Sequence, residues 1–288
     1  RARSGSRRGW RRGVLSCGSS EIPCATPRRW SSRSPSPPRV APEPSPTRFW
    51  CSRFVVSHQT QRVNMRHPTP HGPQSLTENH PGYLPHFLFF PQHDHVFTIG
   101  KRPNAHNILS DPFLLTALDV EVHRSRRGGD VTYHGPGQTI LYPIVNLRAL
   151  GVGARRYVET LEDVMVETCA GFGIDATGRV PGMTGTWVGD KKIGAVGVQI
   201  AGGVTTHGLA FNVRPDLEYF KHIVPCGLRG KRPTSLAKEM ERKRLLCLKP
   251  NTEEAVAGIT AGRAEVEAKL VTAFMQRFGY DDVSMHRE

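Results

Sequence analysis

The sequence predicts a mixed α+β fold in which antiparallel sheets are flanked by helices. Short apolar runs such as Phe87–Phe90 and Val96–Ile99 are rich in the aromatic and β-branched residues that favour strands. Helical periodicity is rarer, and its clearest case is Ala154–Ala170, where apolar residues recur on one face. Strands outnumber helices and the two do not alternate strictly, which favours an α+β arrangement.

The first half of the predicted fold consists mainly of strands. Asp119–His123 alternates between apolar and charged or polar residues, as a half-buried strand does. Thr139–Leu147 is a longer apolar run that follows a glycine-rich segment. With the two runs named above, these segments give four predicted strands before the helix.

The second half begins with a predicted hairpin. Gly185–Lys192 contains a turn at Gly189-Asp190 and is expected to pair with Ile193–Ile200. The next strand is predicted at Val204–Val213, and a long loop follows through Arg232.

The C-terminal helix is predicted from its capping residues. Asn251 is a favourable N-cap, and Glu254 three residues later completes a capping box. The helix is expected to end near Arg277, where Gly279 can adopt the left-handed conformation that closes a helix.

The positive charge of the chain is concentrated at its front. Of the 288 residues, the first 70 hold 14 Arg, no Lys and two Glu, whereas the remainder holds 25 basic and 23 acidic residues. The front is also rich in Ser and Pro, a composition that buries too little apolar surface to offset chain entropy. We therefore expect residues 1–82 to form a disordered basic region and residues 83–288 to form the folded domain.

Three interpretations of the basic region are open. An Arg-rich, Ser-rich and acid-poor segment is typical of an organelle transit peptide, here for a mitochondrion rather than a plastid. The same residues could be a mispredicted 5′ region, since the chain begins with Arg. A nucleic-acid-binding arm is the third interpretation, although no aromatic platform accompanies the basic residues.

The most informative segment is Arg127–Gln138, with the sequence RGGDVTYHGPGQ. It holds four glycines, and glycine lets a backbone approach a ligand closely because it has no side chain. Since the segment leads directly into the predicted strand at Thr139, we interpret it as a ligand-facing loop between two strands.

Together with two later blocks, this segment resembles the signature of the lipoyl(octanoyl) transferases. The blocks are Lys192–Val198 (KIGAVGV) and His207–Leu228, which opens with HGLAFNV and closes with IVPCGL. The resemblance covers residues 85–288 and implies the fold shared by lipoate and biotin protein ligases. It also implies transfer of an octanoyl group from acyl carrier protein to a lysine of lipoyl domains. The implied acceptors are those of 2-oxoacid dehydrogenase complexes and the glycine cleavage H protein.

The chain departs from the family pattern at its N-terminal edge. The family's domain opens with a strand and a long helix, but no such helix is evident between Arg53 and His86, where Pro81 and Pro85 stand in a polar stretch. We therefore expect the opening elements to be missing or rewritten.

Cys226 and Lys192 are the predicted catalytic residues. Cys226 lies in a Pro-Cys-Gly turn, and on the residues alone it could be a nucleophile or a small buried hydrophobe, as Cys169 on its apolar helix face is expected to be. The resemblance implies that Cys226 is the acyl-accepting nucleophile. It also implies that Lys192, directly before Ile193, is the acid–base lysine, whereas Lys191 after the Gly-Asp turn is expected to be solvated.

The same blocks imply the substrate-binding residues. His134 and His207 lie in glycine-flanked motifs, and each could be a pocket wall or a proton-transfer group. Small residues beside Leu209 can form a narrow slot for an acyl chain. The full predicted set is Arg127, Gly128, Gly129, Asp130, Val131, Thr132, Tyr133, His134, Ala195, Val196, Gly197, His207, Gly208, Leu209 and Ala210.

We expect no cofactor and no metal ion, because a thioester donor is already activated and the six cysteines lack metal-site spacing. No apolar run approaches the roughly 18 residues of a membrane span, so no membrane partner is expected. A nucleic-acid partner is not expected either, because the interpretation as a nucleic-acid-binding arm rests only on the basic front of the chain. Two alternatives are open: an ATP-dependent lipoate or biotin ligase of the same fold, and a non-catalytic scaffold that binds lipoyl domains. The presence of both Lys192 and Cys226 argues against the scaffold.

Overall fold

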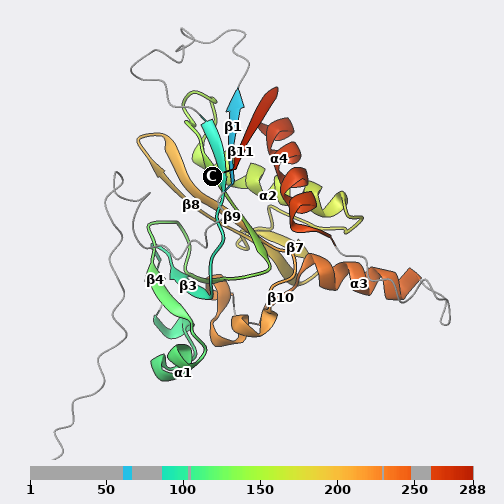
Figure 1. Ribbon diagram of the computed structural model, residues 1–288. Coiled ribbons are helices and arrows are strands. Elements are labelled where there is room, and N and C mark those ends of the chain that lie inside the picture. The colour runs from blue at the N-terminus through green and yellow to red at the C-terminus, as the bar shows by residue number, and fades with distance from the viewer. Residues whose placement is uncertain (1–60, 67–85, 103–104, 229, 248–260, 288) are drawn as a thin grey trace, which may run out of the picture. The chain divides into compact units, whose positions relative to one another are not determined.

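The computed structural model describes residues 61–66, 86–102, 105–228, 230–247 and 261–287. The strands in these ranges form two sheets (Figure 1). The basic region predicted for residues 1–82 lies outside the described residues, apart from 61–66. Within the described ranges, every helix is too short or too polar to cross a membrane.

The large sheet has eight strands. All of its neighbouring pairs are antiparallel except β10 with β8. The order of strands is β10 (Arg232–Pro233), β8 (Lys191–Ala201), β9 (Val204–Asn212), β6 (Gln138–Ile144), β2 (His86–Phe90), β1 (Gln61–Arg66) and β11 (Asp282–Arg287), and β7 (Thr186–Val188) also pairs with β8.

The small sheet has three strands, in the order β4 (Glu121–Arg124), β3 (Val96–Ile99) and β5 (Val131–His134). Strands β3 and β4 are parallel, so the chain must cross over between them. The crossover contains the 3₁₀ turn η1 (Ala105–Asn107) and helix α1 (Pro112–Ala117), whose Leu115 is buried in the core of this sheet. The 3₁₀ helix η2 (Leu217–His222) adds Phe220 to the same core.

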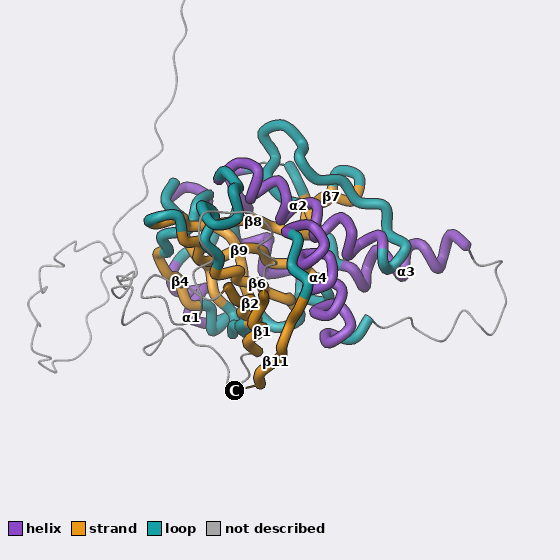
Figure 2. Tube along the Cα trace, turned by 90° about the horizontal axis from the view of Figure 1, so that it is seen from above, coloured by secondary structure: helices purple, strands orange, loops and turns teal. Residues whose placement is uncertain are grey.

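Helices α2 (Ala154–Ala170) and α4 (Arg263–Phe278) pack on each other and on the large sheet (Figures 1 and 2). Their buried faces carry Leu161 and Met165 from α2 and Phe274 from α4. Full burial of such side chains stabilises a fold by roughly 1.5–3 kcal/mol each. Helix α3 (Leu236–Cys247) follows β10 and buries Leu236 and Met240, whereas Leu245 and Leu246 near its end are exposed.

Most of the predicted elements are confirmed. The predicted strand Val96–Ile99 and helix Ala154–Ala170 coincide with β3 and α2. The predicted hairpin turn at Gly189-Asp190 joins β7 to β8. Gly279 has a φ of 70° and ends α4 as predicted, whereas the predicted cap at Asn251 lies outside the described residues and α4 begins at Arg263.

The predicted loop at Val131–His134 is wrong, because these residues form strand β5. All four are buried and pair with β3, so the loop is confined to the glycines on either side. Helices α1 and α3 were not predicted from the sequence. Few of their residues are buried apolar ones, so neither helix shows a clear helical periodicity of apolar residues.

The predicted domain boundary at residue 83 is too late. Strand β1 pairs with both β2 and β11, and its Val63 and Met65 are 1% and 4% exposed. An apolar residue at every second position is what a strand with one buried face requires. Residues 61–66 therefore belong to the folded domain, and β1 is an interior strand of the sheet at the N-terminal end of the domain, where we expected the opening elements to be missing or rewritten.

Removing β1 should destabilise the domain. A chain that starts at residue 71 lacks β1 and leaves β2 and β11 each without one partner, whereas a chain that starts at residue 61 retains it. We expect the thermal unfolding midpoint of the shorter chain to be lower by about 5 °C or more, as loss of a few kcal/mol implies for a domain of this size. Equal midpoints in scanning calorimetry would contradict the place of β1 in the fold.

Candidate active site

Lys192 is the second residue of β8, and pairing on both sides of the strand fixes its position. Its Cα faces Trp187 of β7 and Pro233 of β10, and its carbonyl accepts a hydrogen bond from the Thr234 N–H at 2.8 Å. The side chain is 9% exposed. Its ammonium donates to the Thr184 carbonyl at 2.8 Å and lies 5.4 Å from the centre of the Trp187 ring. Lys192 is therefore a buried lysine, held in place by a backbone carbonyl and an aromatic ring.

Strand geometry separates Lys192 from its neighbour. Adjacent side chains of a strand point to opposite faces, so Lys191 and Lys192 cannot serve the same site. Lys192 lines the pocket described next, whereas Lys191 is half-buried and is not among its lining residues.

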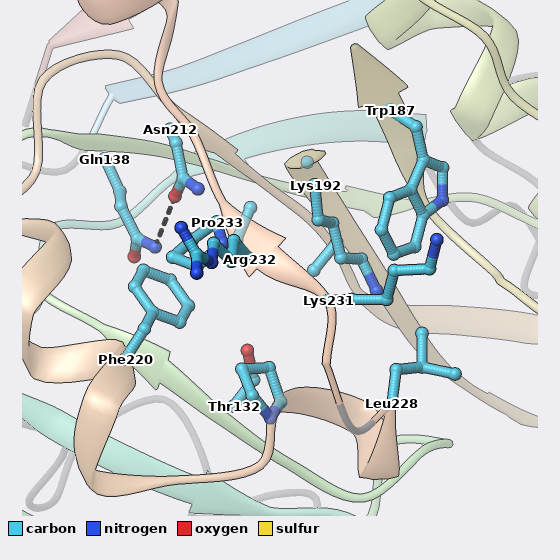
Figure 3. A pocket seen from close by; sticks show the side chains of 14 residues that line it. Thr132, Gln138, Trp187, Lys192, Asn212, Phe220, Leu228, Lys231, Arg232 and Pro233 are labelled. Carbon is cyan, nitrogen blue, oxygen red and sulfur yellow. Dashed lines mark hydrogen bonds between the residues drawn. The ribbon is translucent and has the colours of Figure 1, made fainter. Parts of the chain in front are cut away.

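A pocket beside Lys192 is bounded by β7, β8, β9, β10 and the loop before β10 (Figure 3). Figure 3 shows the Lys192 and Lys231 side chains converging on the Trp187 ring, and the Lys231 ammonium is 6.0 Å from the ring centre. Arg232 is a third cationic side chain in this lining, and none of the described lining residues is acidic. We call this the lysine pocket; it is lined by Thr132, Gln138, Trp187, Lys192, Gly194, Ala195, Ala210, Asn212, Phe220, Pro225, Leu228, Lys231, Arg232 and Pro233.

Cys226 lies in the 3₁₀ turn η3 (Pro225–Gly227). Its side chain is outside the described part of the structure, but the backbone of the turn is held in place. The Val224 N–H donates to the Asn107 carbonyl at 2.7 Å, and Gly227 has a φ of 72°, which favours glycine. Pro225, the first residue of this turn, and Leu228, directly after it, both line the lysine pocket. The turn that contains Cys226 therefore borders the pocket that Lys192 lines.

A second hollow adjoins the lysine pocket and shares Thr132, Ala195 and Ala210 with it. We call it the histidine pocket. Eleven of the predicted substrate-binding residues and one further residue, Tyr142, line it. The full lining is Arg127, Gly129, Thr132, His134, Tyr142, Ala195, Val196, Gly197, His207, Gly208, Leu209 and Ala210.

The remaining predicted residues divide into two groups. Gly128 and Asp130 line a third hollow, which shares Gly129, Val196 and Gly197 with the histidine pocket.

Val131 and Tyr133, in contrast, do not line any of these three hollows. Both are buried in the core of the small sheet, and the Tyr133 hydroxyl is bonded to His95 Nδ1 at 2.9 Å. The reason is strand alternation in β5: Thr132 and His134 face the hollows, so their neighbours face the core. The predicted substrate contact by Val131 and Tyr133 therefore has no support from the geometry of these three hollows.

Arg127 shapes the histidine pocket from a buried position. Its guanidinium donates to the Thr98 hydroxyl at 2.7 Å and 3.2 Å, to the Thr98 carbonyl at 2.5 Å, and to the Gly128 carbonyl at 3.0 Å. The Gly128 N–H in turn donates to the Val198 carbonyl of β8 at 2.8 Å. A Cβ on Gly197 would lie 3.0 Å from Arg127 Cδ and 3.2 Å from the Gly128 carbonyl oxygen. Glycine at position 197 therefore permits the loop to approach β8 this closely.

Residues 73–254 match the family model of the lipoyl protein ligase A/B catalytic domain. The mitochondrial octanoyltransferase LIP2 of Arabidopsis thaliana is 44% identical over 208 residues, which is 72% of this chain and 82% of the relative. The octanoyltransferase of Solibacter usitatus is 38% identical over 194 residues, 67% of this chain and 79% of that one. The chain belongs to the lipoyl protein ligase A/B catalytic domain family. Its activity is octanoyl transfer in protein lipoylation, an acyltransferase reaction.

Solved structures agree with this assignment at the level of the fold. The crystal structure of lipoate-protein ligase A bound with ATP aligns with a TM-score of 0.50 at 17% identity, covering 66% of this chain and 71% of that one. The predicted ligase-like fold is thus confirmed. The alternative of an ATP-dependent ligase is not favoured, because the two relatives described above are named octanoyltransferases.

Two buried histidines, His134 and His207, line the histidine pocket of this octanoyltransferase, and a third buried histidine lies beside them. His93 packs on His134 with ring centres 5.5 Å apart, and Tyr142 packs on His207 at 5.5 Å. Burial lowers the pKa of His93 and of His207 to about 4, with Arg127 adding to the effect on His207. Burial, together with His93 and Arg127, lowers the pKa of His134 well below its usual range. All three rings are therefore neutral at pH 7, and the predicted role of His134 and His207 as pocket walls fits this state better than a proton-transfer role.

Sequence reasoning missed several residues that the fold brings to the site. Gln138 and Asn212 stand inside the quoted motifs, and the Gln138 amide donates to Asn212 Oδ1 at 2.9 Å. His93 has no spacing signal, because its neighbours His134 and Tyr142 come from other strands. Lys231 was missed because it lies outside the quoted motifs, and only the fold places it beside Trp187.

The buried histidines should make the domain sensitive to mild acid. The unfolded chain binds more protons than the folded chain between the ordinary pKa of about 6.5 and the lowered values of about 4, so stability falls as the pH drops below 6.5. Each of His93 and His207 should account for a loss of about 2 kcal/mol between pH 6.5 and pH 5. Urea unfolding measured across this range should show a shallower decline in His207→Gln. The same slope in both proteins would argue that His207 is not held neutral.

Proposed function

We propose that this octanoyltransferase acts by covalent catalysis, with Cys226 as nucleophile and Lys192 as acid–base group. The Cys226 thiolate attacks the thioester of octanoyl acyl carrier protein, and the carrier thiol leaves with a proton from Lys192. The neutral amine of a lipoyl-domain lysine then attacks the acyl-enzyme and passes a proton to Lys192. The C–S bond breaks, which releases the amide product and restores the Cys226 thiolate and the protonated lysine. Two such steps are each easier than one direct transfer.

One observation carries this proposal. Pro225, within the Cys226 turn, and Leu228, directly after it, line the same pocket as Lys192. The proposal is supported further by the two ammonium groups at the Trp187 ring, since a cation near a thiol lowers its pKa from about 8.5 and raises the thiolate fraction.

The histidine pocket is the proposed site of the acyl chain. Its walls combine Leu209, Ala195 and Ala210 with histidines that are neutral at pH 7. An alkyl chain in this hollow would therefore not contact a positively charged imidazole. Burial of each methylene is worth about 0.8 kcal/mol, so a chain of octanoyl length draws much of its affinity from this hollow. Because the two pockets share three residues, the thioester carbon can lie beside η3 while the chain occupies the histidine pocket.

The proposed acceptors are lipoyl domains, including those of 2-oxoacid dehydrogenase complexes and the glycine cleavage H protein. We also propose that the protein works in mitochondria. The Arg-rich, Ser-rich composition of residues 1–70 supports this location, as does the mitochondrial name of the Arabidopsis thaliana relative.

Intact mass spectrometry tests the covalent step. After incubation with octanoyl acyl carrier protein, the protein should gain one octanoyl group that hydroxylamine removes. Cys226→Ser should not gain it. Cys169→Ser should acylate normally, because burial raises the pKa of the Cys169 thiol to about 12 and keeps it protonated. A Cys226→Ser protein that turns over at the wild-type rate would rule out the covalent mechanism.

The two adjacent lysines provide a matched test of the acid–base role. Lys192→Ala should slow both half-reactions by about 100-fold or more, as loss of a general acid–base group does. Lys191→Ala should change them only slightly, because its side chain points away from the lysine pocket. Alkylation of Cys226 by iodoacetamide should shift to higher pH in Lys192→Ala and stay in place in Lys191→Ala. The reverse pattern would show that the wrong lysine has been assigned.

A further inference from the structure

Glu162 is a buried carboxylate on α2, in a helix face that is otherwise mainly apolar. It is 3% exposed. Its two oxygens accept hydrogen bonds from two backbone N–H groups, those of Gly185 and Arg179, each at 2.6 Å. The carboxylate thus ties α2 to both ends of the segment 179–185, which leads into β7.

The segment held by Glu162 has a constrained backbone. Arg179 has a φ of 57°, which is uncommon for a residue with a side chain. Gly185 has a φ of 124°, and a Cβ there would lie 2.5 Å from both Lys192 Cε and the Gly194 carbonyl oxygen. Such conformations persist only where the surroundings hold them. The hydrogen bonds to Glu162 supply this hold at both positions.

The segment ends at the atoms that position Lys192. Thr184 directly precedes Gly185, and its carbonyl accepts the hydrogen bond from the Lys192 ammonium at 2.8 Å. Burial raises the pKa of the Glu162 carboxyl, while the two backbone N–H groups and the Lys192 ammonium oppose that rise. The carboxylate is thus linked to Lys192 through the Thr184 carbonyl and through its charge.

We propose that Glu162 is a positioning residue for Lys192 in acyl transfer, acting through the 179–185 segment. Glu162 does not line the lysine pocket, the histidine pocket or the hollow at Gly128 and Asp130, so it acts without touching substrate there. The inference rests on the proposed acid–base role of Lys192. Glu162 lies outside all of the motifs quoted above. Its role as a positioning residue also gives a reason for the unusual backbone conformations at positions 179 and 185.

The test uses Glu162→Gln, which keeps the size of the side chain but has one acceptor oxygen and no charge. We expect acyl-enzyme formation at saturating octanoyl acyl carrier protein to slow by about 10- to 100-fold, since a small misplacement of a catalytic group has effects of this order. The KM for the carrier should change little, because neither Glu162 nor the 179–185 segment lines the lysine pocket or the histidine pocket. The matched control is Glu267→Gln on α4, a buried carboxylate that pairs with Arg263 at 2.5 Å; it should leave the rate unchanged.

A double-mutant cycle separates positioning from general stability. In a Lys192→Ala background, Glu162→Gln should cause no further loss of rate, because the group that Glu162 positions is already absent. An equal fold-loss in both backgrounds, or no loss in either, would overturn the inference. Should Glu162→Gln fail to fold, Glu162→Asp gives the same cycle, since it keeps the charge but is too short to reach both N–H groups. If instead Lys192→Ala itself has the wild-type rate, the proposed function fails, and the two failures are thereby distinguished.

Discussion

The site depends on one close approach, between the loop at residues 127–129 and strand β8. The Gly128 N–H bonds the Val198 carbonyl, and the buried Arg127 guanidinium ties the same loop to Thr98 of β3. A guanidinium can be buried in this way only when its N–H groups find acceptors, and here backbone and hydroxyl oxygens supply them. The approach joins the small sheet to the large one, and the histidine pocket lies where they meet. The absence of a side chain at Gly197 is the steric condition for the contact.

The same guanidinium affects the chemistry of the pocket as well as its shape. A fixed positive charge near His134 and His207 adds to the effect of burial and disfavours their protonation. A neutral imidazole can still form a hydrogen bond, as His207 does with Ser125 at 3.0 Å. Because it carries no charge, covering it with an alkyl chain does not require a charged group to lose its water. A wall built from histidine can therefore serve an apolar substrate.

The two proposed catalytic residues reach the lysine pocket by different means. Lys192 is fixed by ladders on both sides of β8 and by the Thr184 carbonyl, which is a rigid arrangement. Cys226 stands in a short 3₁₀ turn that is anchored to the η1 turn by the Val224–Asn107 hydrogen bond. A rigid lysine beside a turn that belongs to a longer loop suits the proposed reaction, in which two different protein substrates reach the same thiol in succession.

The sequence by itself determined the α+β class, most of the strands, helix α2 and the three motif blocks, because these depend on local periodicity and on residue types at fixed spacing. Strand alternation implied that only one of Lys191 and Lys192 faces the site, and the resemblance of the block that begins at Lys192 pointed to Lys192. Only the tertiary structure decided that Val131 and Tyr133 face the core while Thr132 and His134 face the pockets, because the burial of both faces of β5 conceals the alternation. It likewise brought His93, Lys231 and Glu162 to the site and added β1 to the sheet. These residues lie far apart in the chain from their partners, and their roles arise from burial, hydrogen bonds and charge that exist only once the two sheets and α2 are packed.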